Sequence, residues 1–220
     1  MKSRDASGVE VDGRKIYPIT FELDGPLAMF TRADTGAVPI SYPIPTPSAL
    51  RGIVENIKRT KGAYFVPVKV QVCKPIRFAN YSFNYGGPLR KSNLLGTTTS
   101  MQVKASVLHD VCYKVFGVIE STNGVGHGNT RHALQCMLHR RIQKGRCYQK
   151  TYFGWSEFFT RYLGPLRSTT SPIDESANVG AVLRSVFAGP GDSAYEPKFI
   201  EDVSIDKGEV IYEEGFESCF

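Results

Sequence analysis

The chain has 220 residues, of which 41% are hydrophobic and 22% charged, and its formal net charge is +6. This composition supports a buried core and excludes a chain that is disordered throughout. Because no apolar run is long enough to cross a membrane and the N-terminus carries no apolar signal region, we expect a cytoplasmic protein with no membrane partner.

The periodicity of apolar residues predicts six elements in the order strand, helix, strand, strand, helix, strand. They cover residues 16–23, 46–58, 64–72, 108–119, 129–146 and 148–155. Residues 1–14 are expected to form a loose leader, and Asp24-Gly25 a turn that ends the first strand. Residues 79–104 are interpreted as an extended hairpin or a flexible loop.

This order predicts an α+β protein with a ferredoxin-like (RRM-type, βαββαβ) fold, in which both helices cover one face of an antiparallel sheet. The open face of such a sheet is a common platform for RNA. We expect this domain to span residues 1–158. Residues 159–220 contain short strand-like segments between turns and are predicted to form a β-rich C-terminal extension.

The helix predicted within residues 129–146 contains no acidic residue. Asn129 or Thr130 can cap its first amides, and Gly145 can end it in the left-handed conformation. Its apolar face is formed by Leu134, Met137, Leu138 and Ile142. Its polar positions carry Arg131, His132, His139, Arg140, Arg141 and Lys144. The start of a helix attracts phosphate, so Arg131 and His132 are placed to face a polyanion.

The basic residues are concentrated in one part of the chain. Residues 56–156 hold 16 Lys or Arg and only two acidic residues, whereas residues 157–220 hold five basic and twelve acidic ones. This asymmetry is typical of a surface that binds nucleic acid. The alternative is a solvated basic surface without a partner.

The sequence lacks the common catalytic motifs. It has neither a phosphate-binding P-loop nor a G-x-S-x-G motif, and its five cysteines include no C-x-x-C pair. We therefore expect no metal and no cofactor. The chemistry that remains is cleavage of RNA by its own 2′-OH, for which His132 can transfer a proton and Arg131 can stabilise charge on phosphorus. The alternative is that His132 is a surface or capping residue.

A second basic group, Lys58, Arg59 and Lys61, follows the first predicted helix and could approach Arg131 and His132. The alternative is that these cations only complement the C-terminus of that helix. Tyr81 could stack on bases or pack against the core. The residues expected to bind RNA are Arg59, Lys61, Arg77, Tyr81, Arg90, Lys91, Arg140, Arg141 and Lys144.

Three segments resemble the CRISPR-associated Cas-five proteins of the type I-C subtype, which belong to the RAMP superfamily. They are GPLAMFT at residues 25–31, SYPIPTPSALRGI at residues 41–53 and KPIRF at residues 74–78. Arg131-His132 and Tyr152-Phe-Gly154 follow in the order that this family uses. The resemblance covers residues 16–160 and fades toward the C-terminus.

The resemblance implies a Cascade subunit with a ferredoxin-like fold that binds repeat RNA, cleaves precursor guide RNA without metal and then caps the 5′ handle. It also implies contacts with the backbone and large subunits of Cascade, and with target DNA indirectly. The family's Lys-His pair corresponds to Arg131-His132. Its catalytic tyrosine corresponds to Lys58, and the Trp-Lys-Pro that follows is replaced by Arg59-Thr60-Lys61. A lysine replaces a phenol only if its pKa is lowered, although it can still stabilise phosphate charge.

From the sequence we therefore expect a metal-independent endoribonuclease in which His132, Arg131 and Lys58 form the catalytic group. Two alternatives remain open at this point. One is a non-catalytic Cascade subunit that holds the guide-RNA 5′ handle, and the other is an unrelated RRM-like module that binds RNA.

Overall fold

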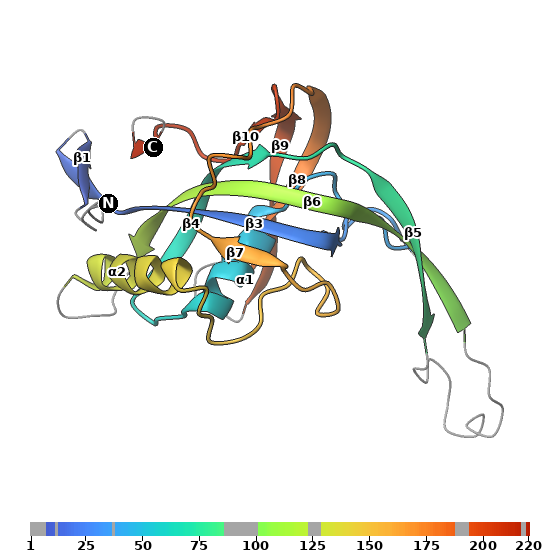
Figure 1. Cartoon of the computed structure of the whole chain (residues 1–220), viewed down its shortest axis with the longest axis horizontal. Helices are drawn as coiled ribbons and strands as arrows, with labels where there is room; N and C mark the ends of the chain where they lie inside the picture. The colour runs from blue at the N-terminus through green and yellow to red at the C-terminus, as the bar shows by residue number, and fades with distance from the viewer. Residues whose placement is uncertain are drawn as a thin grey trace, which may run out of the picture.

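The computed structural model of the chain describes residues 8–11, 13–36, 38–85, 101–122, 129–187, 194–216 and 219–220. Within these ranges the regular secondary structure is mostly strand, and two helices pack against the strands (Figure 1). The elements are β1 (Val9–Val11), β2 (Arg14–Ile16), β3 (Pro18–Ala28), α1 (Pro47–Ile57), β4 (Ala63–Val72), β5 (Phe78–Tyr85), β6 (Met101–Ser121), α2 (Thr130–Gln143), β7 (Tyr162–Gly164), β8 (Ala177–Phe187), β9 (Tyr195–Ile205) and β10 (Glu209–Ile211).

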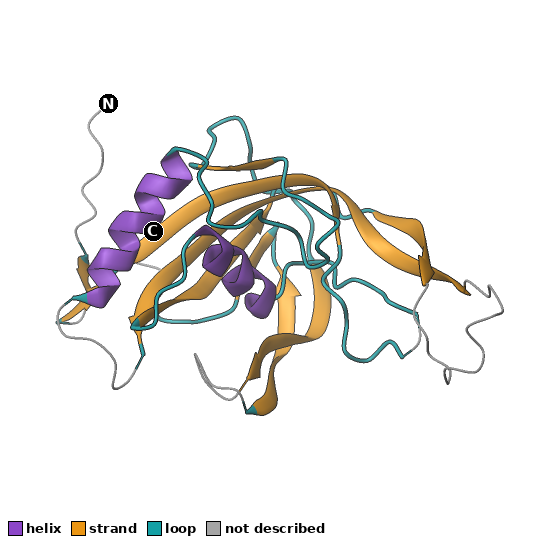
Figure 2. Ribbon diagram, turned by 90° about the horizontal axis from the view of Figure 1, so that it is seen from below, coloured by secondary structure: helices purple, strands orange, loops and turns teal. Residues whose placement is uncertain are grey.

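The main sheet has the strand order β10-β4-β6-β3-β7, and each strand runs antiparallel to its neighbours. Its four strands β7-β3-β6-β4 have the order of a ferredoxin-like sheet, in which β6 separates the parallel pair β3 and β4. Both helices lie on the same side of this sheet (Figure 2). The predicted α+β, ferredoxin-like fold is therefore confirmed.

The two helices begin where the sequence predicts. The hydroxyl of Thr46 accepts a hydrogen bond from the amide of Ala49 at 3.1 Å, and Pro47 occupies the first turn of α1. Asn129 caps α2 through its side chain, and Gly145 follows α2 with φ of +58°. Both helices bury one apolar stripe against the sheet, because their leucines and isoleucines recur at helical spacing.

The first strand of the sheet differs from the prediction. β3 runs through the expected turn at Asp24-Gly25 and ends at Ala28. Asp24 is held by ion pairs, and Gly25 leaves room for a neighbouring ring, because a Cβ built there would lie 2.5 Å from Phe153. The same two residue types that signal a turn in isolation are therefore compatible here with a strand.

Two further predictions about the elements are wrong. The expected loose leader, residues 1–14, contains β1 and the first residue of β2, which pair with each other, while residues 1–7 and 12 lie outside the described residues. Residues 148–155 are not a strand, because the chain bends at Gly154, and Phe153 and the nearby Phe158 are buried on either side of this bend. The edge position that this strand was expected to fill is taken by β7, which pairs with β3.

β5 and β6 confirm the hairpin interpretation of the segment after β4, within the described residues. They pair from Phe78↔Leu108 to Tyr85↔Met101 and extend beyond the body of the protein as an arm (Figure 1). β6 is 21 residues long, so it is both a central strand of the sheet and one strand of the arm. The sequence predicted only residues 108–119 of this strand.

The C-terminal part forms strands as expected. β8 and β9 make a separate two-stranded sheet, whereas β7 and β10 are hydrogen-bonded into the main sheet. A division of the chain at residues 158 and 159 stays a prediction, and two strands that follow it contribute to the sheet of the preceding part. No helix among the described residues is long and apolar enough to span a membrane.

Candidate functional site

The first turn of α2 is fixed by Asn129. The Oδ1 atom of Asn129 accepts a hydrogen bond from the amide of His132 at 3.1 Å, and its Nδ2 atom donates to the hydroxyl of Tyr17. Tyr17 is buried, with 1% of its surface exposed. The start of α2 is therefore attached to the sheet by a buried phenol.

Arg131 and His132 both lie against Tyr17. The guanidinium carbon of Arg131 lies 5.1 Å from the centroid of the Tyr17 ring, and the His132 ring lies 6.0 Å from it. His132 is exposed, and its Nε2 atom lies 3.4 Å from the sulfur of Cys136. An exposed imidazole and a guanidinium thus lie together at the positively polarised end of a 14-residue helix.

The cations that follow α1 surround a cavity. Lys58 is the C-cap of α1, and its amide donates to Val54 at 2.9 Å. Lys58, Arg59 and Lys61 line a cavity of about 330 Å³ between α1, the start of β4 and α2. Arg59 is largely exposed and its Nε atom lies 3.9 Å from Glu55. Among the described residues, no carboxylate is within ion-pair distance of Lys58 or Lys61.

The loop that carries Lys58 and Lys61 is joined to the start of α2 at Gly62, but His132 lies on the flank of α2 that is turned away from these lysines. The carbonyl of Gly62 accepts a hydrogen bond from the hydroxyl of Thr130 at 3.1 Å, which joins the loop after α1 to the start of α2. Leu134 lines the cavity. With about 3.6 residues per turn, Thr130 lies on the same flank of α2 as Leu134, whereas His132 lies on the opposite flank. Within the described ranges, no contact links Lys58 directly to His132.

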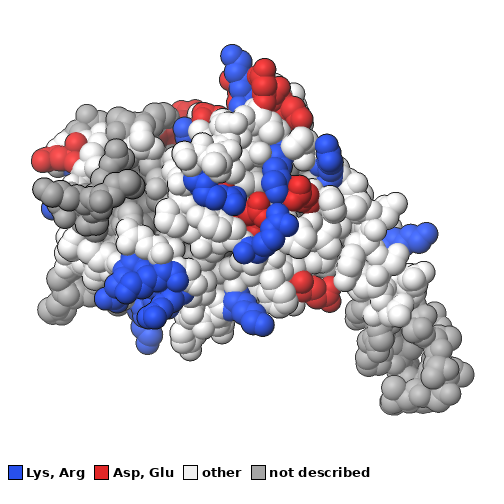
Figure 3. Space-filling model, viewed as in Figure 1, with Lys and Arg blue, Asp and Glu red and all other residues white. Residues whose placement is uncertain are grey.

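The remaining basic residues of α2 divide into two kinds. Arg141 donates a hydrogen bond to the carbonyl of Ile57 at 3.1 Å, so it ties α2 to the last turn of α1. Arg140 and Lys144 are exposed. Figure 3 shows basic side chains without acidic ones over the region of α2, which agrees with the predicted polyanion-binding surface. His139 is half-buried, so it is less accessible to solvent than His132. Burial also lowers the pKa of His139.

The residues predicted on the arm occupy a different part of the molecule. Arg77 is exposed beside β5. The Tyr81 ring packs edge-to-face on Phe158 at 5.2 Å, and its hydroxyl donates to Glu157 at 3.3 Å. Of the two alternatives for Tyr81, packing is the contact that the structure contains. Arg90 and Lys91 lie outside the described residues.

The opposite face of the sheet carries a group of ion pairs that the sequence analysis missed, and we call it the carboxylate network. It consists of Glu22, Asp24 and Asp110 with Lys74, Arg161 and Arg167. Glu22 is fully buried and accepts hydrogen bonds from the Arg167 amide and Nε atom, both at 2.7 Å. The available signal was the alternation of Glu22 and Asp24 with Phe21 and Leu23 along one strand, because alternation puts the two acids on a common face.

The cations of the network keep its buried carboxylates ionised. Burial acts to raise the pKa of Glu22, but hydrogen bonds from Arg167 and Thr170 outweigh it, so the pKa is lowered. For Asp24, burial again acts to raise the pKa, and the Lys74 and Arg161 hydrogen bonds lower it overall. Lys74, Arg161 and Arg167 on this face are therefore paired with carboxylates, and RNA binding by this face stays a prediction.

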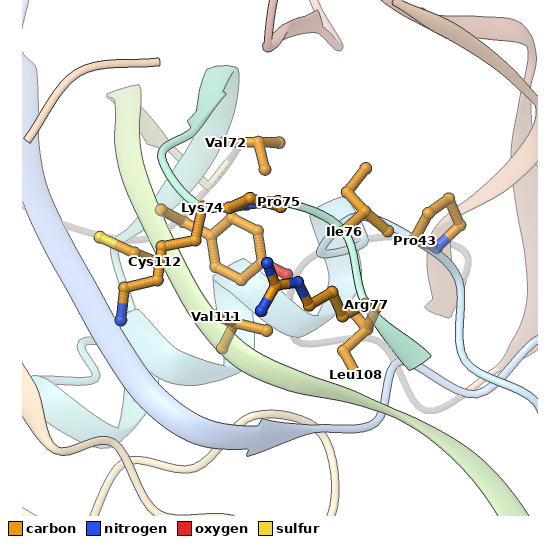
Figure 4. A pocket seen from close by; sticks show the side chains of 10 residues that line it. Pro43, Val72, Lys74, Pro75, Ile76, Arg77, Leu108, Val111 and Cys112 are labelled. Carbon is orange, nitrogen blue, oxygen red and sulfur yellow. The ribbon is translucent and has the colours of Figure 1, made fainter. Parts of the chain in front are cut away.

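A small hollow lies at the edge of the carboxylate network. It is lined by Lys74, Pro75, Arg77 and Val111 among others and has a volume of about 10 Å³ (Figure 4). This volume is enough for about one water molecule, so the hollow is not a ligand site. In the part of the chain that the structure describes, no three His, Cys, Asp or Glu side chains gather as a metal site would require.

Comparisons with known proteins agree on one family. The family model for CRISPR-associated Cas5 proteins of the Cas5d type matches residues 19–191. The CRISPR pre-crRNA endoribonuclease Cas5d of Mannheimia succiniciproducens is 32% identical over 157 residues, which cover 64% of this chain and 69% of that protein.

Two solved structures share the fold. The crystal structure of a CRISPR-associated protein has a TM-score of 0.65 and 19% identity, over 91% of this chain and 93% of that one. A functionally uncharacterized protein of Streptococcus mutans has a TM-score of 0.64 and 19% identity, over 91% of this chain and 94% of its own. At this level of identity the two structures support the fold and nothing more specific.

Proposed function

This chain belongs to the Cas5d family of CRISPR-associated proteins, and on that premise we propose that it binds CRISPR repeat RNA and cleaves precursor guide RNA without a metal ion. Membership in the family removes the alternative of an unrelated RRM-like module. The proposal extends to this chain the activity that the name of the Mannheimia succiniciproducens protein states.

The observation that carries the proposal is the arrangement of Arg131 and His132 at the start of α2. The helix terminus and the guanidinium both favour a phosphate at this point, and the exposed imidazole lies next to it. Lys58 and Lys61, which have no carboxylate within ion-pair distance among the described residues, line the neighbouring cavity together with Leu134 of α2. An RNA strand that crosses the start of α2 would therefore meet positive charge on both flanks.

The reaction that suits these groups is attack of an RNA 2′-OH on the adjacent phosphorus. The 2′-oxygen loses its proton and forms the new P–O bond, the bond to the 5′-oxygen breaks, and that oxygen takes up a proton. The products are a 2′,3′-cyclic phosphate and a 5′-OH. His132 accepts or donates one of these protons, while Arg131 stabilises the charge on the phosphorane. Lys58 binds phosphate from the cavity side.

Metal independence is supported by the residue types present. The basic segment 56–156 contains only Asp110 and Glu120 as acids, and Asp110 pairs with Lys74 in the carboxylate network. A two-metal nuclease needs several carboxylates around the scissile phosphate. The side chains around Arg131 suit proton transfer and charge stabilisation instead.

Cleavage of a matched repeat RNA in the presence of EDTA tests the proposal. We expect the wild-type protein to cut, and His132→Ala to cut at least about 100-fold more slowly, because general acid–base catalysis contributes about 10²–10⁴ in rate. His109→Ala is the matched control, since His109 is an exposed histidine on β6. Absence of cleavage, or equal cleavage by His132→Ala, would contradict the enzymatic proposal.

A second candidate function is favoured by one observation, which is that position 58 carries a lysine rather than a phenol. In this alternative the chain is a structural Cascade subunit that holds the guide-RNA 5′ handle and contacts the backbone and large subunits, and through them target DNA. Tight binding of the handle without cleavage at any pH would support it. In the leading proposal the protein cuts first and then caps the same handle.

A further inference from the structure

The cavity beside α1 has the size and position of a ligand site. Its volume of about 330 Å³ falls within the range of about 300–1,000 Å³ that is usual for small-molecule pockets. It opens between α1, the loop that contains Lys58 and Lys61, the start of β4, and α2. Nothing in the proposed proton-transfer chemistry at His132 requires it.

One wall of the cavity presents an aromatic ring and a guanidinium. Tyr64 is partly exposed, and the guanidinium carbon of Arg51 lies 5.2 Å from the centroid of its ring. Arg51 is held in place by Glu55, at 2.9 Å between Nε and the carboxylate. Val54, Phe65 and Leu134 contribute apolar surface beneath. Rings and guanidinium planes of this kind are what unpaired bases stack on.

The rim of the cavity is cationic and continues to the start of α2. Lys58 and Lys61 lie on the rim, and the carbonyl of Gly62 accepts hydrogen bonds from the amide of Thr122 and the hydroxyl of Thr130, both at 3.1 Å. A planar apolar ligand in the cavity would therefore hold an attached phosphate among cations. That phosphate would lie one helix flank away from Arg131 and His132.

We propose that this cavity binds the base of one unpaired nucleotide of the RNA, with Tyr64 and Arg51 as its stacking wall and Lys58 and Lys61 as its phosphate contacts. The choice of RNA as the source of the nucleotide rests on the proposed function. The base in the cavity sets the register of the strand, and so decides which phosphate reaches Arg131 and His132. Tyr64 and Arg51 are specificity-determining residues in this account.

Titration of the full chain with nucleoside 5′-monophosphates tests the cavity directly. The four nucleotides and ribose 5-phosphate are added separately, and binding is followed by calorimetry or ligand-observed NMR. We expect at least one nucleotide to bind about fivefold or more tightly than ribose 5-phosphate, because stacking adds to the phosphate contact. Equal affinity for ribose 5-phosphate and all four nucleotides would overturn the proposal.

Variants of Tyr64 locate the binding. Tyr64→Leu is expected to reduce nucleotide affinity to that of ribose 5-phosphate, whereas Tyr64→Phe retains the ring and the affinity. Tyr195→Leu is the matched control, because Tyr195 is 75% exposed on β9 and outside the cavity. If Tyr64→Leu does not fold, Tyr64→Phe still tests the ring, because a loss of nucleotide affinity in this variant would contradict stacking on the ring. Loss of affinity in Tyr195→Leu, or none in Tyr64→Leu, would place the site elsewhere.

Repeat RNAs with single abasic positions separate this inference from the proposed function. We expect one abasic position to weaken binding by about fivefold or more, and the loss to disappear in Tyr64→Leu. If nucleotides bind and the repeat RNA is not cut, the cavity assignment stands without the nuclease. If the RNA is cut and no abasic position or nucleotide depends on Tyr64, the nuclease stands and the cavity assignment is wrong.

Discussion

Two regions of the molecule use the same cationic residue types for different purposes. In the carboxylate network, Lys74, Arg161 and Arg167 lie within 3.1 Å of the oxygens of Glu22, Asp24 or Asp110. At the helix ends, Lys58, Lys61 and Arg131 have no carboxylate within ion-pair distance among the described residues. Figure 3 shows mixed charges over the middle of the sheet and basic charge alone over the region of α2.

The presence or absence of a carboxylate partner indicates which basic residues are available to bind a polyanion. A lysine that is already paired with a buried carboxylate contributes to folding, and removing its partner leaves charge without compensation. The charge of a lysine without such a partner is not neutralised within the protein, so it attracts phosphate. The three predictions below test this comparison, from the largest expected effect to the smallest.

Removal of the buried carboxylate should give the largest loss of stability. Glu22→Ala takes away the acceptor of the Arg167 amide and guanidinium and of the Thr170 hydroxyl. We expect the free energy of unfolding to fall by about 3 kcal/mol, the lower end of the range for a broken buried pair, because Arg167 stays 33% exposed. Urea unfolding measures the loss. The control Glu196→Ala, on an exposed strand, should cost less than about 1 kcal/mol.

Acid should destabilise the protein through the same network. The pKa values of Glu22 and Asp24 are lowered in the folded state, so their contribution to stability is present above the unfolded pKa of about 4 and is lost as the pH falls through the folded values. Each proton taken up adds about 1.4 kcal/mol per pH unit to the loss.

Urea unfolding at pH 7, 5, 4 and 3 measures this dependence. Glu22→Gln should show a shallower decline than the wild-type protein below pH 4, because one titrating carboxylate has been removed. Glu196→Gln is the control and should follow the wild-type curve. An equally steep decline in Glu22→Gln would mean that other carboxylates dominate the acid transition.

The same substitution, lysine to glutamine, should change RNA affinity in one region and thermal stability in the other. Lys61→Gln should lower RNA affinity by about fivefold and reduce the slope of log affinity against log salt by about one, while the melting temperature stays constant. Lys74→Gln should lower the melting temperature and leave RNA affinity unchanged at a temperature where the protein is folded. Salt-dependent binding and thermal melts measure both. A comparable loss of affinity in Lys74→Gln would break the distinction between the regions.

Local sequence signals predicted the elements whose ends are set by local hydrogen bonds. Thr46 and Pro47 identified the start of α1, Asn129 and Gly145 the limits of α2, and alternating valines identified β4. Signals that depend on distant partners misled the prediction. Asp24-Gly25 indicated a turn and lies within β3, because Asp24 pairs with Arg161 and Gly25 makes room for Phe153.

The candidate site was predicted in part. Arg131 and His132 were identified as neighbours at a helix start, and the structure places both beside Tyr17. The sequence contained no signal for Tyr17, which lies over a hundred residues earlier in the chain, or for the flank on which Lys58 lies. RNA binding by Arg141 stays a prediction, and its hydrogen bond to Ile57, which joins α2 to α1, could not be predicted because only the fold brings that carbonyl within reach.

The sequence by itself determined the order of the first five core elements, the basic character of its middle segment and the family to which the chain belongs. These properties depend on residue type and spacing along the chain, which folding does not change. Only the tertiary structure decided which cations are neutralised and which face a cavity, because Asp24 and Glu22, which pair with Arg161 and Arg167, lie more than a hundred residues away from them. The fold therefore determines which positive charges remain without a carboxylate partner and are available to bind RNA.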